Sequence, residues 1–310
     1  MVILITGING FIGNNLVDSF ADHHQILGLD IINNPREGVL KTYLWEEISE
    51  IPHYDVLIHL AGKAHDTDNR IDIKSYFDIN TELTKKIYDY FLTTDATKFI
   101  FFSSVKAIAD KVLGDILTEE DSPDPKTAYG QSKYAAEKYI NNNINSNKKN
   151  IYILRPCMIH GSGNKGNLNL LYSIVKQNIP WPLGLFENKR SFLSIDNLKF
   201  FLYEIIHTNI PSGVYNLSDD EPITTNELVL LISKSLNKKP MIWKIPKQII
   251  YGIAFLGDFI KLPINRERLK KLTENYVVSN QKIKSVIGKS LPIKTKDGLI
   301  KTFNELARNY

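Results

Sequence analysis

Only one cysteine, Cys157, occurs among the 310 residues of the chain. A single thiol excludes a disulfide within the chain and a metal site built from cysteines, and we predict no bound metal. Long hydrophobic runs are also missing, because the longest, at 249–257, is interrupted by Asp258 well short of the roughly 20 residues that span a bilayer. We therefore predict no membrane insertion and interpret this run as a buried or partly exposed helix, with contact to a membrane surface as the alternative.

A strong excess of one charge is missing as well. The chain has 38 basic and 34 acidic residues, a net charge of +4 that is too even to indicate a nucleic-acid partner. The basic excess gathers toward the C-terminus, where we interpret it as a solvated face from which a few lysines could serve an anionic substrate. No basic leader precedes the apolar residues that begin at Val2, so we expect no secretory signal and a cytoplasmic protein.

Three closely spaced glycines lie near the N-terminus in the pattern G-x-x-G-x-x-G: Gly7, Gly10 and Gly13. The apolar run 2–5 before them has strand composition, and 11–20 after them, opening with Phe11 and Ile12, has the apolar spacing of a helix. Glycines between a strand and a helix let the backbone approach a pyrophosphate, which then faces the N–H groups of the helix. A tight turn that only packs the helix on the strand is the alternative.

Asp30 ends the next strand-like run, 25–30. An acidic residue about 20 positions after such glycines hydrogen-bonds the adenosine ribose hydroxyls of a dinucleotide. Asp30 therefore favours NAD(H) over NADP(H), because a carboxylate repels a 2′-phosphate. Arg36, a few residues on, would soften this preference.

Strand-like and helical patterns alternate through the first half of the chain, which predicts an α/β fold with a doubly wound parallel sheet of the Rossmann type. Strands are expected at 2–5, 26–31, 55–60, 98–103 and 150–154, and helices at 11–20, 72–92 and 128–145. We assign 1–160 to an NAD(P)-binding domain and 161–310 to a smaller, mostly helical substrate-binding region, some segments of which return to the core sheet. Two later strands are expected at 190–195 and 214–217.

Tyr129 and Lys133 lie one helical turn apart, so their side chains share one face of the predicted helix. A phenol titrates near pH 10, and a neighbouring ammonium favours the phenolate, which suits the pair to proton transfer near neutral pH. Ser104 follows the fourth predicted strand, at the sheet edge where ligands bind. The alternatives are a surface tyrosine beside a lysine, and a serine that only satisfies the backbone at a strand end.

These pieces together resemble the extended short-chain dehydrogenase/reductase family, and within it the nucleotide-sugar epimerases, dehydratases and 4-ketoreductases. The matching motifs follow the family's order and spacing through the N-terminal half: Thr6 to Gly13, Asp30, His59-Leu60-Ala61-Gly62, Ser103-Ser104, Tyr129 to Lys133 and Arg155-Pro156. Looser matches in the C-terminal half are Gly166-Asn167-Leu168 and Arg190 to Ile195.

The resemblance implies a role for each matching residue. Tyr129 would be the general acid/base, Ser104 would hydrogen-bond the same substrate oxygen, and Lys133 would hold the nicotinamide ribose and lower the pKa of Tyr129. The cofactor cleft would be lined by Leu60, Ala61 and Gly62, with Asn80 nearby. The substrate diphosphate would be bound by Asn167 and Arg190, with Arg268 as a further candidate beside a solvated-charge interpretation. The resemblance also implies a homodimer and a nucleotide-sugar substrate.

Departures from the family pattern bear on the reaction. Val105-Lys106 follows Ser104 where the dehydratases have an Asp-Glu pair, which argues against a 4,6-dehydratase. The residues after Arg155 also differ from those usual in the UDP-galactose 4-epimerases. We therefore favour an NAD(P)H-dependent 4-ketoreductase of a dTDP- or UDP-linked 4-keto-6-deoxy sugar, in the synthesis of bacterial surface polysaccharides such as lipopolysaccharide O-antigen. A UDP-hexose 4-epimerase is the first alternative, and a non-catalytic NAD-binding protein is the second.

Overall fold

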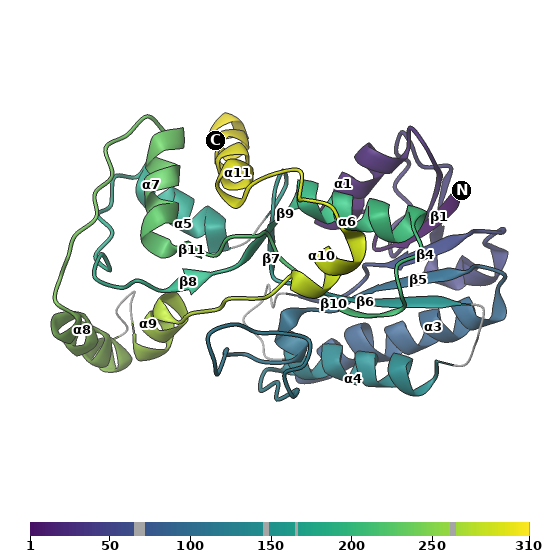
Figure 1. Cartoon of the computed structure of the whole chain (residues 1–310), viewed down its shortest axis with the longest axis horizontal. Coiled ribbons are helices and arrows are strands. Elements are labelled where there is room, and N and C mark those ends of the chain that lie inside the picture. Colours follow the sequence, from purple (N-terminus) through teal and green to yellow (C-terminus); the bar gives the residue numbers. More distant parts are fainter. Residues whose placement is uncertain (65–71, 145–148, 165–166, 261–264, 310) are drawn as a thin grey trace.

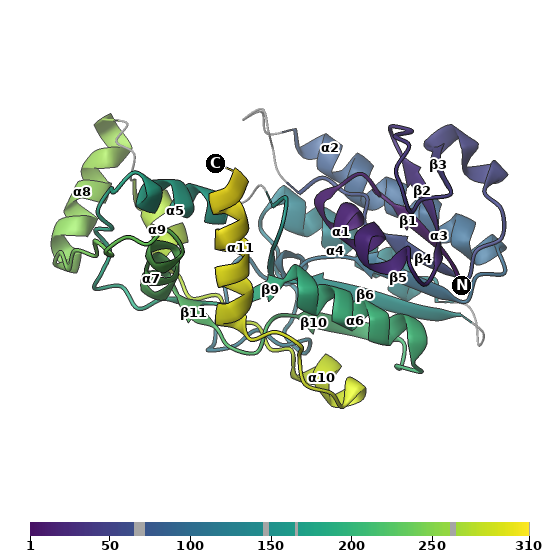
Figure 2. The same ribbon diagram turned by 90° about the horizontal axis from the view of Figure 1, so that it is seen from above.

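A seven-stranded parallel sheet is the centre of the molecule, which we describe from a computed structural model covering residues 1–64, 72–144, 149–164, 167–260 and 265–309. The strand order is β10-β6-β5-β4-β1-β2-β3 (Figures 1 and 2). The strands are β1 (Val2–Thr6), β2 (Gln25–Asp30), β3 (Lys41–Leu44), β4 (Val56–His59), β5 (Lys98–Phe102), β6 (Asn150–Pro156) and β10 (Gly213–Leu217). The order reverses after β1, so the loops that follow β1 and β4 leave side by side, at the place where open α/β sheets bind ligands.

Both faces of the sheet are buried under helices. One face is covered by α1 (Phe11–Phe20) and α6 (Ile195–His207), and the other by α3 (Leu83–Thr93) and α4 (Ala128–Asn142). Successive residues of β1 enter different cores, since Ile3 and Ile5 pack on the α1 side and Leu4 packs on the α3 side. Burial on both faces explains why the strands are continuous apolar runs in the sequence.

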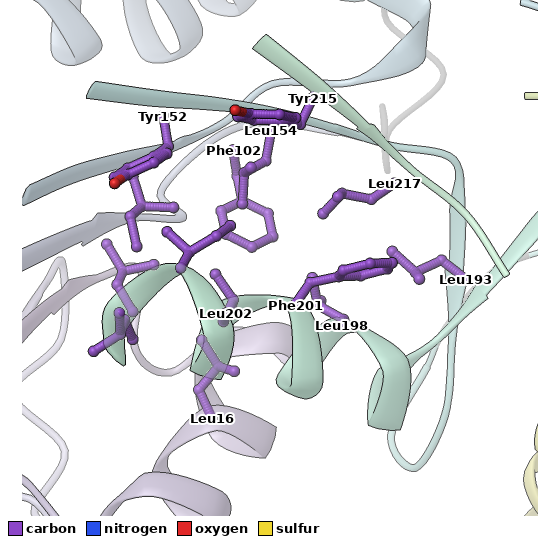
Figure 3. Packing of buried hydrophobic residues seen from close by; sticks show 14 of the residues in the cluster. Leu16, Phe102, Tyr152, Leu154, Leu193, Leu198, Phe201, Leu202, Tyr215 and Leu217 are labelled. Carbon is purple, nitrogen blue, oxygen red and sulfur yellow. The ribbon is translucent and has the colours of Figure 1, made fainter. Parts of the chain in front are cut away.

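Helix α6 belongs to the sheet layer although it lies late in the chain. Figure 3 shows Leu198, Phe201 and Leu202 of α6 packed between Leu16 of α1 and the side chains of β6 and β10. These α6 residues are fully buried. The late segments α6 and β10 therefore complete the core of the nucleotide-binding half.

The remaining C-terminal elements form a second hydrophobic core beside the sheet. Its helices are α5 (Asn167–Lys176), α7 (Thr225–Ser235), α8 (Lys247–Ile260), α9 (Arg266–Thr273) and α11 (Thr295–Asn309). Two small sheets join the halves, β8 (Lys189–Arg190) with β11 (Ile223–Thr224), and β7 (Met158–His160) with β9 (Phe192–Ser194). A short helix, α10 (Gln281–Ile287), contacts β10. Within the described ranges, no helix is both long enough and apolar enough to cross a bilayer.

The doubly wound parallel sheet and the helical segment near 72–92 are confirmed, whereas one strand was missed and the strand expected at 190–195 was wrong. The edge strand β3 was not predicted, because four residues of mixed polarity give no periodic signal. The helix expected at 72–92 is divided into α2 (Ile73–Phe77), the π-helical turn η2 (Asp78–Glu82) and α3. The strand expected at 190–195 is two short strands, β8 and β9, in different sheets.

Candidate active site

The glycine loop joins β1 to α1 by backbone contacts that exclude larger residues. Gly7 has φ +70°, and a Cβ there would lie 2.8 Å from the backbone nitrogen of Ala61. A Cβ on Gly13 would lie 2.3 Å from the carbonyl oxygen of Ile8, so the helix sits directly on the strand end. Gly10 is the N-cap of α1 and offers no side-chain cap, which leaves the first N–H groups of the helix available to an anion.

Asp30 lies at the carboxyl end of β2, beside this loop. Its carboxylate accepts hydrogen bonds from the backbone nitrogens of Asn9 (2.9 Å) and Ile31 (2.7 Å), which fix its orientation. Arg36 forms an ion pair with Asp18 and a hydrogen bond with Asn14, so its charge is already compensated. The arrangement supports a preference for an unphosphorylated ribose, and the softening expected from Arg36 is not supported.

A buried chain of hydrogen bonds holds the neighbouring loop, 60–62, in place. His59 at the end of β4 lies 2.6 Å from the Thr6 hydroxyl through Nδ1 and 2.9 Å from the Thr84 hydroxyl through Nε2. Thr84 donates its only hydroxyl proton to the carbonyl oxygen of Asn80, so Nε2 of His59 must carry a proton and Nδ1 must accept from Thr6. Burial lowers the pKa of His59 to about 3, which keeps the ring neutral. The Thr6 hydroxyl in turn accepts from the backbone nitrogen of Ala61, which anchors the loop.

Lys133, Asn80 and Gly62 meet at the sheet edge. A Cβ on Gly62 would lie 2.9 Å from Nζ of Lys133 and 3.0 Å from Oδ1 of Asn80. Asn80 is fully buried on the π-helical turn η2, and it bonds both the backbone of Lys63 and the hydroxyl of Ser132. Single π-turns of this kind are frequent at functional sites. The structure thus brings these three predicted residues together.

Tyr129 and Ser104 form a pair because α4 approaches the short helix η3 (Val105–Ala107) very closely. A Cβ on Gly130 would lie 2.4 Å from the carbonyl oxygen of Lys106, so only glycine allows this contact. The hydroxyl of Tyr129 hydrogen-bonds that of Ser104. Thr127 caps α4 by accepting from the Gly130 nitrogen, which fixes the start of the helix.

The pKa values of this group differ from the expected ones. Burial raises the pKa of Tyr129 above 10, and the hydrogen bond with Ser104 offsets only part of the rise. The ammonium of Lys133 donates to the carbonyl oxygen of Phe102 at 2.8 Å, and burial lowers its pKa to about 8 while Glu137 opposes the shift. The expected lowering of the phenol pKa by Lys133 is therefore not seen in this arrangement, because burial raises this pKa and only the hydrogen bond with Ser104 lowers it.

A buried ion pair connects helix α4 to strand β6. It was not predicted from the sequence. Arg155 on β6 contacts the carboxylate of Glu137 through Nε at 3.0 Å and a terminal nitrogen at 2.6 Å, and Ser103 donates to the same carboxylate. Both charged side chains are buried. Glu137 lies one turn after Lys133 on α4, a spacing that could have revealed it.

The structure locates the predicted substrate-binding residues less fully than the predicted cofactor-binding residues. Arg190 is partly buried on β8 and pairs with Tyr276 in a β-bridge. Tyr276 donates its hydroxyl to the carbonyl oxygen of Ala109 at 2.6 Å, and Nζ of Lys106 lies 4.1 Å from its ring centroid. Arg190 is therefore linked to the loop that carries Ser104.

Arg268 and Asn167 are the other two residues predicted to bind the substrate. Arg268 lies exposed on α9, beside α8, so its role in binding phosphate stays a prediction. Asn167 is the first residue of α5, and its side chain lies outside the described part of the chain. Its role also stays a prediction.

The residues around the loop fit an NAD molecule. The uncapped start of α1 would face the pyrophosphate, Asp30 the adenosine ribose, and Lys133 the nicotinamide ribose. Gly7 and Gly62 keep this edge of the sheet clear, since a Cβ at either would collide with a neighbour. No cluster of metal-ligating side chains occurs in the described ranges. Fold and site together define a dinucleotide-binding protein with an acid/base side chain at the sheet edge.

Comparison with known proteins identifies the family. The model of the NAD dependent epimerase/dehydratase family matches residues 3–217, and the chain belongs to this family. The chain is 29% identical to the UDP-glucose 4-epimerase of Vibrio cholerae, over 97% of this chain and 94% of that protein. It is 26% identical to N-acetyl-alpha-D-glucosaminyl-diphospho-ditrans,octacis-undecaprenol 4-epimerase of Escherichia coli O157:H7, over 91% of this chain and 84% of that protein.

Solved structures share the fold. The UDP-glucuronic acid 4-epimerase of Bacillus cereus, solved in complex with NAD, superimposes with a TM-score of 0.75 at 18% identity and covers all of both chains. The chain is thus an NAD-dependent enzyme of the nucleotide-sugar epimerase, dehydratase and reductase group.

Proposed function

We propose that the enzyme is an NAD-dependent 4-epimerase of a UDP-linked hexose, glucose/galactose or the N-acetyl form, in bacterial surface polysaccharide synthesis. The observation that carries the proposal is the hydroxyl pair of Ser104 and Tyr129, held beside buried Lys133 at the edge that also presents the glycine loop. Two hydroxyls that meet at one point can grip one substrate oxygen, and one of them can exchange a proton with it.

Each residue of the pair has a defined task in this reaction. Tyr129, in its phenolate form, takes the proton of the C4 hydroxyl as the carbonyl forms, and Ser104 holds the same oxygen by a hydrogen bond. After the sugar turns over, Tyr129 returns the proton to this oxygen as the alcohol forms again with the opposite configuration at C4. NAD, when bound, would supply the acceptor and donor of the C4 hydride. The chain's own contribution is orientation of C4 and control of one proton.

Two features favour the epimerase over the 4-ketoreductase that the sequence alone suggested. Asp30 and the compensated charge of Arg36 support use of NAD, and an epimerase regenerates its cofactor within each cycle. The similarity to a 4-epimerase extends over nearly the whole chain.

The 4-ketoreductase is the second candidate, and one observation favours it. The raised pKa of Tyr129 keeps the phenol protonated at neutral pH, ready to donate to the alkoxide that forms when a 4-keto sugar is reduced. The sequence Val105-Lys106 after Ser104 points the same way.

One assay separates the two reactions. Purified enzyme is incubated with UDP-glucose, UDP-galactose or their N-acetyl forms, and the products are separated by chromatography while nicotinamide absorbance is followed. Interconversion without net change in absorbance is the expected result. Stoichiometric oxidation of NADH or NADPH with a 4-keto-6-deoxy sugar nucleotide, and no interconversion, would establish the reductase. A parallel sample uses a sugar linked through diphosphate to a polyprenol, because one relative acts on such a compound.

A further inference from the structure

Helix α8 has two apolar faces, and only one of them is buried. Ile250 and Ala254 point into the second core and are almost completely buried. A second series with the same spacing of three or four residues faces solvent: Ile249, Ile253, Leu256 and Phe259. Phe259 is 70% exposed and Leu256 is 54% exposed. A helix that is apolar all round is normally buried on all sides, so the outward face of α8 lacks the cover that its composition requires.

The exposed face continues beyond the helix. Trp243, just before α8, is 54% exposed, and Tyr251 and Phe255 on the flank of the helix are also exposed. Single exposed apolar residues are ordinary, whereas a contiguous group of large ones marks an interaction site. Tryptophan and tyrosine, with apolar rings and a polar tip, are the residues enriched where protein meets the head groups of a membrane.

Basic residues lie before α8 and on the neighbouring helix α9. Between Lys234 and Lys271 the sequence has ten lysines and arginines against two acidic residues, whereas the whole chain has a net charge of only +4. Lys244 and Lys247 are exposed at the start of α8, and Arg266 on α9 lies over the ring of Phe255 at 5.2 Å. One of the two acidic residues, Asp258, is paired with Arg266. The surface is thus an apolar strip with a basic border.

The position of the strip allows it to meet a flat surface. Both views place α8 at the end of the molecule opposite β1, with no other labelled element outside it (Figures 1 and 2). The helix has 14 residues, about 21 Å at 1.5 Å per residue, too short to span a bilayer and suited to lie along its surface.

We propose that α8 and its basic border dock the enzyme on the surface of an anionic lipid bilayer. Leu256, Phe259 and Trp243 enter the boundary between head groups and acyl chains, and Lys244 and Lys247 bind lipid phosphates. A second copy of the chain is a poorer occupant, because a two-fold contact would place two basic surfaces against each other. The proposal concerns attachment and holds for either reaction at C4.

Vesicle flotation of the full chain tests the proposal. Binding to vesicles of phosphatidylcholine with phosphatidylglycerol is compared with binding to phosphatidylcholine alone, at low and high salt. We expect strong binding to the anionic vesicles only, weakened by salt because counterions screen the border. Failure to bind anionic vesicles, or equal binding to both lipids at all salt concentrations, would overturn the proposal.

Paired variants separate the strip from the rest of the surface. Leu256→Ser with Phe259→Ser should lower the partition coefficient by about tenfold or more, because two large apolar groups no longer leave water. Leu113→Ser is the control, since Leu113 is 95% exposed between β5 and α4. Lys244→Glu with Lys247→Glu should abolish the preference for anionic lipid, whereas Lys138→Glu on α4 should leave it unchanged.

Two further readouts keep the result independent of folding and of the reaction. Unchanged circular dichroism and NAD affinity show that a variant is folded, and turnover on a soluble nucleotide sugar should match the unmodified chain. Sedimentation velocity is measured in parallel. If the chain self-associates through Phe259 and does not bind vesicles, the strip is a contact between copies and the proposal fails.

Discussion

Helices α1, α3, α4 and α6 press their apolar residues against the parallel sheet, whereas α8, in the C-terminal half, turns a row of large apolar residues to solvent. At the sheet edge the buried side chains of His59, Asn80 and Glu137 all have hydrogen-bond partners.

This difference shows which half of the molecule covers its own helices and strands. In the nucleotide-binding half each strand is covered on both faces, and the polar side chains at its edge are oriented by one another. The C-terminal half closes only one side of its outermost helix. The first half thus has the rigid sheet edge that a cofactor site needs, and the second leaves the apolar outer face of α8 exposed.

The largest expected effect is on the site of the first half. Tyr129→Phe removes the hydroxyl that exchanges the proton, and general acid–base groups contribute about 10²- to 10⁴-fold to rate. We expect turnover to fall within this range while NAD affinity, measured by fluorescence titration, changes little. Tyr134→Phe on the same helix is the control and should keep full activity. Normal turnover of Tyr129→Phe would remove Tyr129 from the mechanism.

Burial of Lys133 should appear in the pH dependence of stability. Its folded pKa of about 8 lies below the ordinary lysine value of 10.5, so between these pH values the unfolded chain binds more protons and the free energy of unfolding rises with pH. The gain across this window is about 3 kcal/mol at 1.4 kcal/mol per unit. Urea unfolding from pH 8 to 10.5 should show this rise, and Lys133→Met should lack it. Parallel curves for both proteins would contradict the assignment.

Gly13→Ala should disturb the joint between β1 and α1. The added Cβ meets the Ile8 carbonyl, a backbone atom that cannot move away cheaply. We expect a loss of about 1–3 kcal/mol in the free energy of unfolding, the usual cost of overpacking, together with weaker NAD binding. An unchanged urea midpoint and NAD affinity would show that the loop is looser than its contacts indicate.

The smallest expected effect is a gain in stability, and it concerns helix α8 in the C-terminal half. Gly252 lies inside α8, and nothing lies within 4 Å of a Cβ placed there. Gly252→Ala should therefore raise the free energy of unfolding by about 0.5–1 kcal/mol, because alanine favours a helix interior over glycine. Thermal unfolding of both glycine variants in parallel tests the contrast, and a destabilised Gly252→Ala would show that α8 is tightly covered.

Local pattern was enough to predict the sheet half except for its edge strand β3. The glycine loop, Asp30 and the pair Tyr129 and Lys133 each depend on spacing within one strand–loop–helix unit, so a single segment carries the signal. The bounds of α1 were predicted to the residue, 11–20, because its apolar spacing is regular and Gly10 marks its start. The family resemblance and the use of NAD follow from these segments.

Other features required the chain to be folded. Arg155 pairs with Glu137, and Thr6 contacts His59, across different strands and helices. Local spacing places Glu137 one turn after Lys133 but cannot predict these long-range contacts. The rise in the pKa of Tyr129 reverses the expectation from its lysine neighbour, because burial depends on everything packed around a group. The apolar run at 249–257 could be identified as a helix from sequence, yet only the tertiary structure decided which of its two apolar faces is covered. Short-range chemistry thus fixes the cofactor site, and long-range packing decides what stays exposed.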